Sequence, residues 1–209
     1  MKKGKILIII GIILIAGALA LTGWNLWTGY AAAKSADEAA QKVMDLTNTD
    51  PVPPEGRLIS DDPADIEYPD YILNPDMEMP IKTVDGRDYI GTLSIPGLGI
   101  LLPVQSEWNY PNLRISPCRY SGTAYKGNFV ICAHNYDRHF GQIKNLHYGD
   151  KISFLDLDGN RFSYIIEEVE TLRPTAVEEM TSDEWDLTLF TCTLGGSTRI
   201  AVRCMKEGK

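Results

Sequence analysis

Hydrophobic residues follow two different patterns along the chain. An apolar run over residues 6–21 holds sixteen residues without a charge, and an uncharged stretch extends it to Trp27. From Asp88 onward, short apolar or β-branched runs instead alternate with turn residues at close spacing. The first pattern has the length of a membrane-spanning helix, and the second is typical of a domain built mainly from strands.

The second pattern predicts seven strands and two short helices. The strands are expected at residues 89–95, 100–104, 128–134, 151–156, 161–171, 187–192 and 198–204. Pairs such as Pro96 and Gly97, or Gly195 and Gly196, supply turn chemistry between them. The helices are expected at residues 140–146 and 181–185. This content predicts an all-β domain, either a barrel or a sandwich.

The apolar run has the flanks of an uncleaved membrane anchor. Three lysines lie within the first five residues, while Trp24, Trp27 and Tyr30 follow the run and suit the outer membrane interface. A cleaved signal peptide is the alternative, indicated by the small residues Ala18 and Ala20. We expect residues 1–30 to form a single-pass anchor in the cell membrane. The positive-inside bias then places the N-terminus in the cytoplasm and the rest of the chain outside.

A stalk and an acidic linker are expected to separate the anchor from the folded domain. Residues 31–46 are rich in helix formers and predict a continuation of the first helix as a stalk. Residues 51–80 contain seven of the twelve prolines and eight Asp or Glu against Arg57 alone, so little regular structure is expected there. The predicted domains are therefore 1–30 (anchor), 31–80 (stalk helix and Pro-rich linker) and 81–209 (catalytic domain).

The charge and the cysteines narrow the class of function. The net charge of −8 argues against nucleic-acid binding, which favours basic patches. The four cysteines, at positions 118, 132, 192 and 204, show no zinc-type spacing, so no metal is expected on them. If Cys192 stays a free thiol, the other three allow at most one disulfide, and their spacing does not choose the pair.

A cysteine and an arginine on adjoining strands are the first candidates for chemistry. The run Thr188-Leu189-Phe190-Thr191-Cys192 predicts a strand that ends in a cysteine, and Arg199 follows seven residues later at the start of the next strand. A thiol at a strand end beside a guanidinium is a plausible nucleophile next to a fixed oxyanion donor. Upstream, another apolar run ends in Ala133-His134-Asn135 and offers a proton-transfer base.

Together these residues resemble the signature of the sortases, cysteine transpeptidases of the Gram-positive cell surface. The resemblance covers about residues 88–205. It implies a closed β-barrel of about eight strands with short helices in its loops. The short interval from Thr171 to Leu187 favours a class D-like or unassigned subclass.

The resemblance also implies a role for each candidate residue. Cys192 would be the nucleophile, because a thiolate needs a nearby cation or base and both are at hand. His134 would protonate the departing amine and accept a proton from the incoming one. Arg199 would stabilise the oxyanion, since its guanidinium stays charged and lysine lacks its planar fork. The substrate-binding candidates are the three residues that shape the nucleophile strand, Thr188, Leu189 and Thr191.

Other polar residues are given simpler expectations. His139 is expected in a solvated loop, and His147 in a surface turn. Arg203 lies on the same strand face as Arg199 and is expected to be peripheral to the chemistry. Glu178 and Glu179 precede the nucleophile strand, where some sortases bind calcium. Two adjacent carboxylates are more often simply solvated, so no cofactor is expected and calcium is the less favoured alternative.

The sequence therefore predicts a membrane-anchored cysteine transpeptidase. It would cleave a sorting signal of the Leu-Pro-x-Thr-Gly type between Thr and Gly through a Cys192 thioester. Its partners would be surface proteins that carry such a signal and an amine of a peptidoglycan precursor or a pilin. A surface cysteine hydrolase with the same Cys-His-Arg site is one alternative. A non-catalytic adhesion barrel is another, although such a module has no need of these three residues together.

Overall fold

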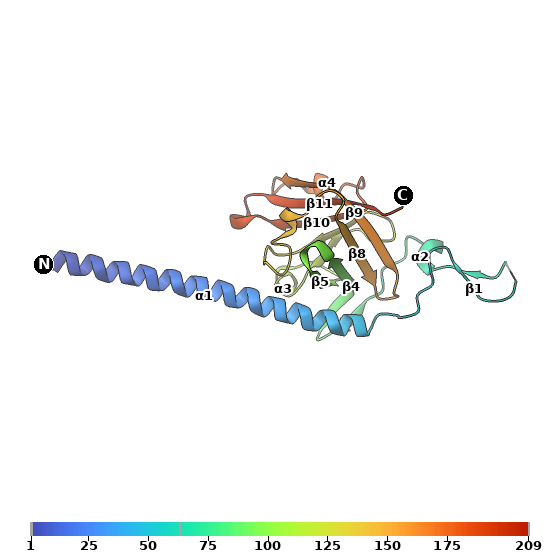
Figure 1. Cartoon of the computed structure of the whole chain (residues 1–209), viewed down its shortest axis with the longest axis horizontal. Coiled ribbons are helices and arrows are strands. Elements are labelled where there is room, and N and C mark those ends of the chain that lie inside the picture. Colours follow the sequence, from blue (N-terminus) through green and yellow to red (C-terminus); the bar gives the residue numbers. More distant parts are fainter. Residues whose placement is uncertain (1, 63, 209) are drawn as a thin grey trace.

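A long N-terminal helix, α1 (Lys2–Asp45), leads into a β-barrel in the computed structural model, which describes residues 2–62 and 64–208 (Figure 1). The stretch Gly4–Thr28 of this helix is long and apolar enough to cross a membrane, and none of it is buried against the rest of the chain. Helix formers continue to Asp45, so the helix runs on without a break from the apolar stretch to the barrel.

Eight strands form one closed barrel. Each strand is hydrogen-bonded to the next, and the last pairs back with the first. In spatial order they are β4 (Arg87–Ile95), β5 (Ile100–Gln105), β6 (Cys118–Ser121), β7 (Phe129–Cys132), β10 (Leu187–Cys192), β11 (Arg199–Lys206), β9 (Arg161–Leu172) and β8 (Lys151–Asp156). A short strand, β3 (Lys82–Val84), extends the edge beside β4. The predicted closed barrel of about eight strands is confirmed.

Glycine at position 91 allows the barrel to close. Gly91 lies where β4 pairs with both β5 and β8, and its φ of 151° is a conformation that L side chains rarely adopt. A Cβ there would clash with the Leu155 carbonyl oxygen of β8. The barrel interior is filled by inward side chains such as Leu93, Phe129 and Phe154, which belong to the largest buried cluster.

One parallel pairing sets the position of the site. Strands β7 and β10 run parallel, with Phe190 opposite Cys132, whereas β10 and β11 are antiparallel. Parallel strands end at the same edge of a sheet. The last residues of β7 and β10 and the first residue of β11 therefore meet at one end of the barrel.

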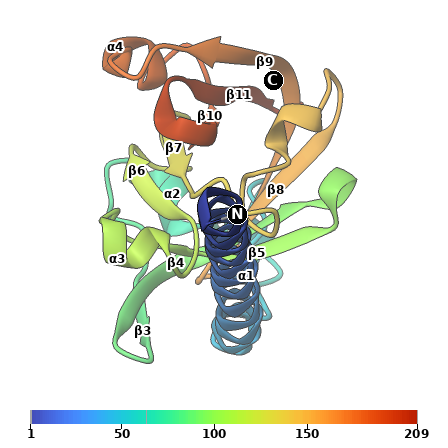
Figure 2. The ribbon, with the colours of Figure 1, turned by 90° about the vertical axis from the view of Figure 1, so that its left-hand side faces the viewer.

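The second half of α1 packs against the barrel beside β3, β4 and β5 (Figure 2). Its buried residues are small or β-branched and recur at helical spacing: Ala36, Ala39, Ala40 and Val43. The ion pair between Lys42 and Asp85, with nitrogen and oxygen 2.6 Å apart, adds a polar contact at the edge. The predicted stalk is thus docked on the catalytic domain over its last turns.

The linker contains more regular structure than the sequence predicts. Strands β1 (Arg57–Leu58) and β2 (Ile66–Glu67) form a two-residue ladder, and α2 (Asp70–Leu73) follows. The Tyr71 ring stacks on that of Tyr125, with ring centroids 4.9 Å apart, and this contact fixes the linker to the barrel. Local turns and one aromatic anchor therefore order a segment that its composition describes as irregular.

Short helices occupy the loops. They are η1 (Pro96–Leu98), α3 (Tyr110–Leu113), η2 (Ile143–Asn145), α4 (Val177–Met180) and η3 (Leu194–Gly196). The helix predicted at residues 181–185 is wrong, since the helical turn lies just before it in α4. The Ser182 hydroxyl accepts a hydrogen bond from the Glu184 backbone N–H, a local turn that competes with a helix. The helix predicted at 140–146 is reduced to η2.

Candidate active site

The nucleophile candidate lies at the end of a strand that is hydrogen-bonded to the histidine segment. Cys192 is the last residue of β10 and is half-buried. One residue earlier, the buried Thr191 hydroxyl donates to the Ala133 carbonyl at 2.8 Å. The Ala133 backbone N–H in turn donates to the Phe190 carbonyl at 3.2 Å. These two bonds fix the end of β10 to the residue that precedes His134.

Arg199 lies directly across the ladder from Cys192. The two residues are partners in the register of β10 and β11. A turn with Gly195 at φ 79° and Gly196 at φ 72° joins the strands, a conformation that favours glycine. The Arg199 Nη1 donates to the carbonyls of Gly196 and Thr198, each at 3.0 Å. Bonding through one nitrogen positions the guanidinium and leaves its other donors for a ligand.

His134 completes the group from the segment that follows β7. Continuing the parallel register by two residues places it level with Cys192. Its ring is half-buried and lies 5.0 Å from the Tyr136 ring, centroid to centroid. Burial lowers the pKa of His134, and the nearby Arg114 charge lowers it further. The neutral imidazole, the form that accepts a proton, is therefore favoured.

The three side chains line a common cavity of about 200 Å³. The rest of its wall is mainly apolar and includes aromatic rings from several elements. Trp108 lies 5.6 Å from Tyr120, and Tyr120 lies 5.1 Å from Phe190, between ring centroids. The remaining lining residues are Tyr110, Leu113, Cys132, Ala133, Arg173, Pro174, Ala176, Val177, Met180 and Thr191. This cavity suits an extended peptide with apolar side chains.

A second cavity, of about 490 Å³, also reaches Cys192. Its wall contains more polar groups, among them Asn135, Asp137, Gln142 and Thr198. Gln142 Nε2 donates to the Asp137 carboxylate at 2.9 Å, which orients that charge. Cys192 therefore lies between an apolar cavity and a more polar one, an arrangement that suits two successive substrates.

The other cysteines differ from Cys192 in their burial. All four are free thiols, but Cys118, Cys132 and Cys204 are buried. Burial raises the pKa of Cys118 to about 12, and it also raises the pKa of Cys132 and of Cys204. Cys118 and Cys132 are cross-strand neighbours on β6 and β7 without a disulfide between them. A thiolate at neutral pH is strongly disfavoured at these three positions.

Two of the expected substrate contacts are placed inside the barrel wall. Thr188 and Leu189 are fully buried. Of the three expected substrate contacts, only Thr191 is among the described residues that line the two cavities. The Thr188 hydroxyl instead accepts a hydrogen bond from Arg203 Nη1 at 3.0 Å. Thr188 and Leu189 therefore hold the nucleophile strand in place, and Thr191 remains the member that borders the site.

Arg203 is a buried structural residue. Its Nε pairs with Glu170 on β9 at 2.6 Å. Its Nη2 donates to the Glu179 carbonyl at 2.8 Å, and its Nη1 reaches the Met180 carbonyl at 3.4 Å. The side chain thus connects three strands to the loop whose Met180 lines the apolar cavity. The sequence predicted only a peripheral Arg203, because spacing indicates on which face of a strand a residue lies but not which partners it has.

The other two histidines have different environments. His139 is fully buried, so its expected place in a solvated loop is wrong. The loop after β7 folds inward: the Phe140 backbone N–H donates to the His134 carbonyl at 3.1 Å, and the His139 ring lies 5.4 Å from that of Tyr136. His147 lies on the surface, as expected, 4.0 Å from Asp150 between Nδ1 and Oδ2.

Glu178 and Glu179 lie on α4 with exposed side chains. Among residues 2–62 and 64–208, no group of three His, Cys, Asp or Glu is arranged to hold a metal ion.

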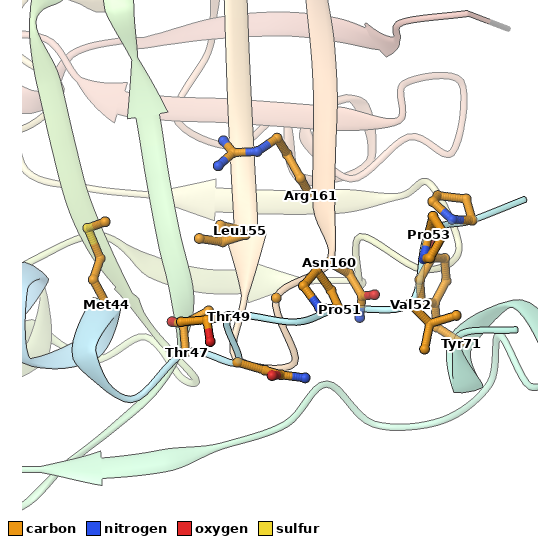
Figure 3. Close-up of a pocket in the computed structure, with 13 residues that line it drawn as sticks. Met44, Thr47, Thr49, Pro51, Val52, Pro53, Tyr71, Leu155, Asn160 and Arg161 are labelled. Carbon is orange, nitrogen blue, oxygen red and sulfur yellow. The ribbon is translucent and has the colours of Figure 1, made fainter. Parts of the chain in front are cut away.

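A third cavity, of about 490 Å³, lies far from this group, between the linker and the β8–β9 turn (Figure 3). Its lining includes Met44, Pro51, Tyr71 and Arg161. Among the described residues that line it there is no cysteine or histidine. We therefore place the chemistry at the Cys192 end of the barrel.

Residues that no motif indicated also shape the site. Trp108 and Tyr120 form the aromatic wall, and Arg114 and Tyr136 lie beside His134. The aromatic residues between the predicted strands were the available signal, since exposed aromatics in loops often mark binding surfaces.

Comparison with known proteins gives a consistent result. A family model described as the sortase domain matches residues 93–207. Sortase A of Bacillus anthracis is 28% identical over 206 residues, which cover 92% of this chain and 89% of that protein.

Two solved structures from Clostridium perfringens have a similar fold. A sortase D5 transpeptidase has a TM-score of 0.52 and 24% identity, over 61% of this chain and 83% of that one. A sortase C, determined with the C-terminal cell wall sorting motif, has a TM-score of 0.52 and 24% identity, over 66% and 82%.

Proposed function

The chain belongs to the sortase family of cysteine transpeptidases, which act in cell wall protein anchoring or pilin assembly, and on that premise we propose a specific reaction for it. The enzyme cleaves a C-terminal sorting signal of the Leu-Pro-x-Thr-Gly type between Thr and Gly. It then joins the new carboxyl end to an amine of peptidoglycan or of a pilin. The observation that carries this proposal is the position of Cys192 between two cavities, with His134 and Arg199 on the wall of the first.

In the first step the sorting signal occupies the apolar cavity. Neutral His134 takes the thiol proton of Cys192, and the thiolate sulfur attacks the Thr carbonyl carbon. The oxygen that becomes negative is stabilised by the free donors of Arg199. When the intermediate collapses, the Thr–Gly amide bond breaks and the His134 imidazolium gives its proton to the leaving amine. The products are a Cys192 thioester and a peptide that begins with Gly.

In the second step an amine attacks the thioester from the polar cavity. His134 accepts the proton that the amine loses, and the departing thiolate takes that proton back, so the enzyme is restored. Asp137 gives this cavity a carboxylate that attracts an ammonium group before it is deprotonated. In the proposed reaction His134 accepts and returns every proton that is transferred, so the reaction requires no metal or other cofactor.

The sorting signal is proposed from the character of the apolar cavity. Its aromatic and aliphatic wall complements a Leu-Pro pair, while the three reactive residues lie where a Thr-Gly bond would follow. The C. perfringens sortase C that was determined with a C-terminal cell wall sorting motif supports the same substrate class by analogy of fold.

We also propose that α1 anchors the enzyme in the cell membrane, with a cytoplasmic N-terminus and an extracellular barrel. The apolar stretch Gly4–Thr28 and the lysines before it support this topology. Protein extracted from membranes is expected to retain Met1 or Lys2 at its N-terminus. Recovery of a species that starts near Leu21 would replace the anchor with a cleaved signal peptide.

A thioester trap tests the reaction itself. The full chain, incubated with a Leu-Pro-x-Thr-Gly peptide, should form an adduct on Cys192 with the mass of the part before Gly. Hydroxylamine should release it as a hydroxamate. Cys192→Ala should abolish the adduct, whereas Cys204→Ala, at a free cysteine outside both cavities, should keep it. Cleavage that survives in Cys192→Ala would end the proposal.

Product analysis separates transfer from hydrolysis. In the presence of a glycine-based amine, a transpeptidase gives mainly the amide, and a hydrolase gives mainly the free acid. Excess EDTA is expected to leave either product unchanged, and a loss of activity restored by calcium would reverse the assignment of no cofactor.

A further inference from the structure

The membrane stretch of α1 and the barrel share one cavity, of about 520 Å³. From α1 it is lined by Trp24, Asn25, Trp27, Thr28 and Ser35, and from the barrel by Arg114, Ile115 and Tyr136. The barrel segment that ends α3 therefore reaches back to the level of the apolar stretch. The separation between membrane and catalytic domain is small on this side.

The two tryptophans indicate where this cavity lies relative to the membrane surface. Trp24 and Trp27 lie in the last five residues of the stretch Gly4–Thr28 and are 67% and 63% exposed. Indole rings at the end of a membrane helix settle at the headgroup level. Arg114 lines the same cavity as both indoles, so this part of the barrel lies beside the end of the apolar stretch.

The charge of Arg114 is uncompensated in the described part of the chain. Its side chain is exposed and makes no ion pair or side-chain hydrogen bond with residues 2–62 or 64–208. The neighbouring cations differ, since Arg138 pairs with Asp37 at 3.9 Å and Lys34 with Glu38 at 3.8 Å. An unpaired guanidinium presents a planar fork that fits two phosphate oxygens.

We propose that this cavity binds the headgroup of an anionic phospholipid, with Arg114 on the phosphate and the indoles of Trp24 and Trp27 beside the glycerol and upper acyl region. The inference rests on the proposed membrane anchoring. The occupant is a lipid of the surrounding membrane, because the cavity opens beside a helix that is otherwise surrounded by acyl chains. The Asn25 amide, on the same wall, offers polar contacts to the headgroup.

The site connects the membrane surface to the catalytic end. Tyr136 lines the lipid cavity and also contacts the His134 ring, with centroids 5.0 Å apart. The turn between β10 and β11 points toward the N-terminal end of α1 (Figures 1 and 2). A bound headgroup would thus help to hold the Cys192 end of the barrel near the membrane surface, where an anchored protein substrate arrives.

Lipid retention on the full chain tests the proposal. The purified protein in a neutral detergent is mixed with equal amounts of phosphatidylglycerol and phosphatidylcholine, and bound lipid is counted by native mass spectrometry. One phosphatidylglycerol per chain should be retained in preference. Arg114→Gln should weaken this retention about fivefold, the effect of one guanidinium at an anionic surface. The matched variant Arg138→Gln, which removes a cation that is already paired, should retain the lipid as the parent does.

Each other outcome overturns the inference. Equal retention of the two lipids would show that the cavity does not select an anionic headgroup. Unchanged retention in Arg114→Gln would show that Arg114 binds no headgroup. Displacement of the lipid by an equal concentration of inorganic phosphate would show a site for a free anion. Transpeptidation is measured on the same samples, and resistance to carbonate extraction on the membranes before they are solubilised, so a failed lipid site is distinguished from a failed enzyme or a failed anchor.

Discussion

Two arginines on one face of β11 show how the same residue type is used in opposite ways. Arg199 faces Cys192 at the end of the strand pair, and Arg203 faces Thr188 four residues further along. Arg199 is half-buried and bonds through Nη1 to two carbonyls of its own turn. Arg203 is only 2% exposed and uses Nε, Nη1 and Nη2 on Glu170, Thr188 and the α4 loop.

The difference lies in what remains free on each guanidinium. The donors of Arg203 are used in hydrogen bonds within the fold, so its removal leaves buried acceptors and a charged partner without a bond. Arg199 keeps donors toward the apolar cavity, where a substrate oxygen would become negative. We infer that one arginine holds the wall of the site and that the other acts within it.

The histidines repeat this contrast. His134 is half-buried between Tyr136 and the cavity, and His139 is fully buried five residues later. Burial lowers the pKa of His139 to about 4, and the nearby His134 adds to the effect. The neutral form of His139 is therefore favoured at physiological pH, and His139 is not among the described residues that line either cavity at Cys192.

The largest expected effect is on catalysis at Arg199. Arg199→Lys keeps the charge but loses the planar fork, so acylation of Cys192 should lose about 2.7–4 kcal/mol of transition-state stabilisation if Arg199 acts as a full oxyanion donor. Single-turnover adduct formation followed by mass measures this directly. Arg203→Lys makes the same substitution at the other arginine of β11 and serves as the control. Near-normal acylation in Arg199→Lys would make Arg199 peripheral and would remove the contrast.

Stability should show the reverse order. Arg203→Met leaves Glu170 without its cation and should cost about 3 kcal/mol, the lower end for a broken buried ion pair, because the Glu170 side chain is 29% exposed. The same substitution at the other arginine, Arg199→Met, should change stability by less than about 0.5 kcal/mol. Thermal unfolding of the full chain in detergent, followed by circular dichroism, compares the two. Equal destabilisation would show that both arginines are structural.

Much of this arrangement is visible in the sequence, because the reactive residues lie at the ends of strongly β-forming runs. Strands β7, β10 and β11 were predicted within three residues of their ends, so the placement of Cys192 beside Arg199 needed only a hairpin. The position of His134 level with Cys192 required a parallel pairing between segments 58 residues apart, measured from Ala133 to Thr191. The motif resemblance implied that the three residues act together, but neither it nor the hydrophobic pattern predicted this pairing.

The missed features depend on long-range contacts. Strand β6 (Cys118–Ser121) has little apolar patterning and exists because β5 and β7 pair with it. The burial of His139 and the partners of Arg203 follow from loops that fold back on the barrel. The spacing of residues along a strand predicts which face of the sheet a side chain lies on. Which residues pack against that face depends on the tertiary structure.

The next effect is a pH dependence of stability that originates at His139. Its folded pKa, about 4, lies below the ordinary value of 6.5, so the unfolded chain binds the proton more readily as the pH falls. The contribution of the neutral His139 ring to the free energy of unfolding is complete above pH 6.5 and is lost as the pH falls toward 4. Between pH 7.5 and pH 5 the loss should be about 2 kcal/mol. Thermal unfolding of His139→Leu should be flatter over this range than that of the parent, and parallel curves would contradict the buried neutral ring.

The smallest expected effect concerns the bond that joins the two halves of the site. Thr191→Val keeps the shape of the side chain but leaves the buried Ala133 carbonyl without the hydroxyl that donates to it at 2.8 Å. The loss should destabilise the protein by about 1 kcal/mol. It should also slow acylation several-fold, because Cys192 and His134 are positioned through this contact. Thr171→Val, on the exposed face of β9, is the matched control and should change neither quantity. If Thr191→Val lowers stability and leaves acylation intact, the bond belongs with Arg203 to the fold. If it slows acylation by more than its stability cost implies, the bond belongs with Arg199 to the site.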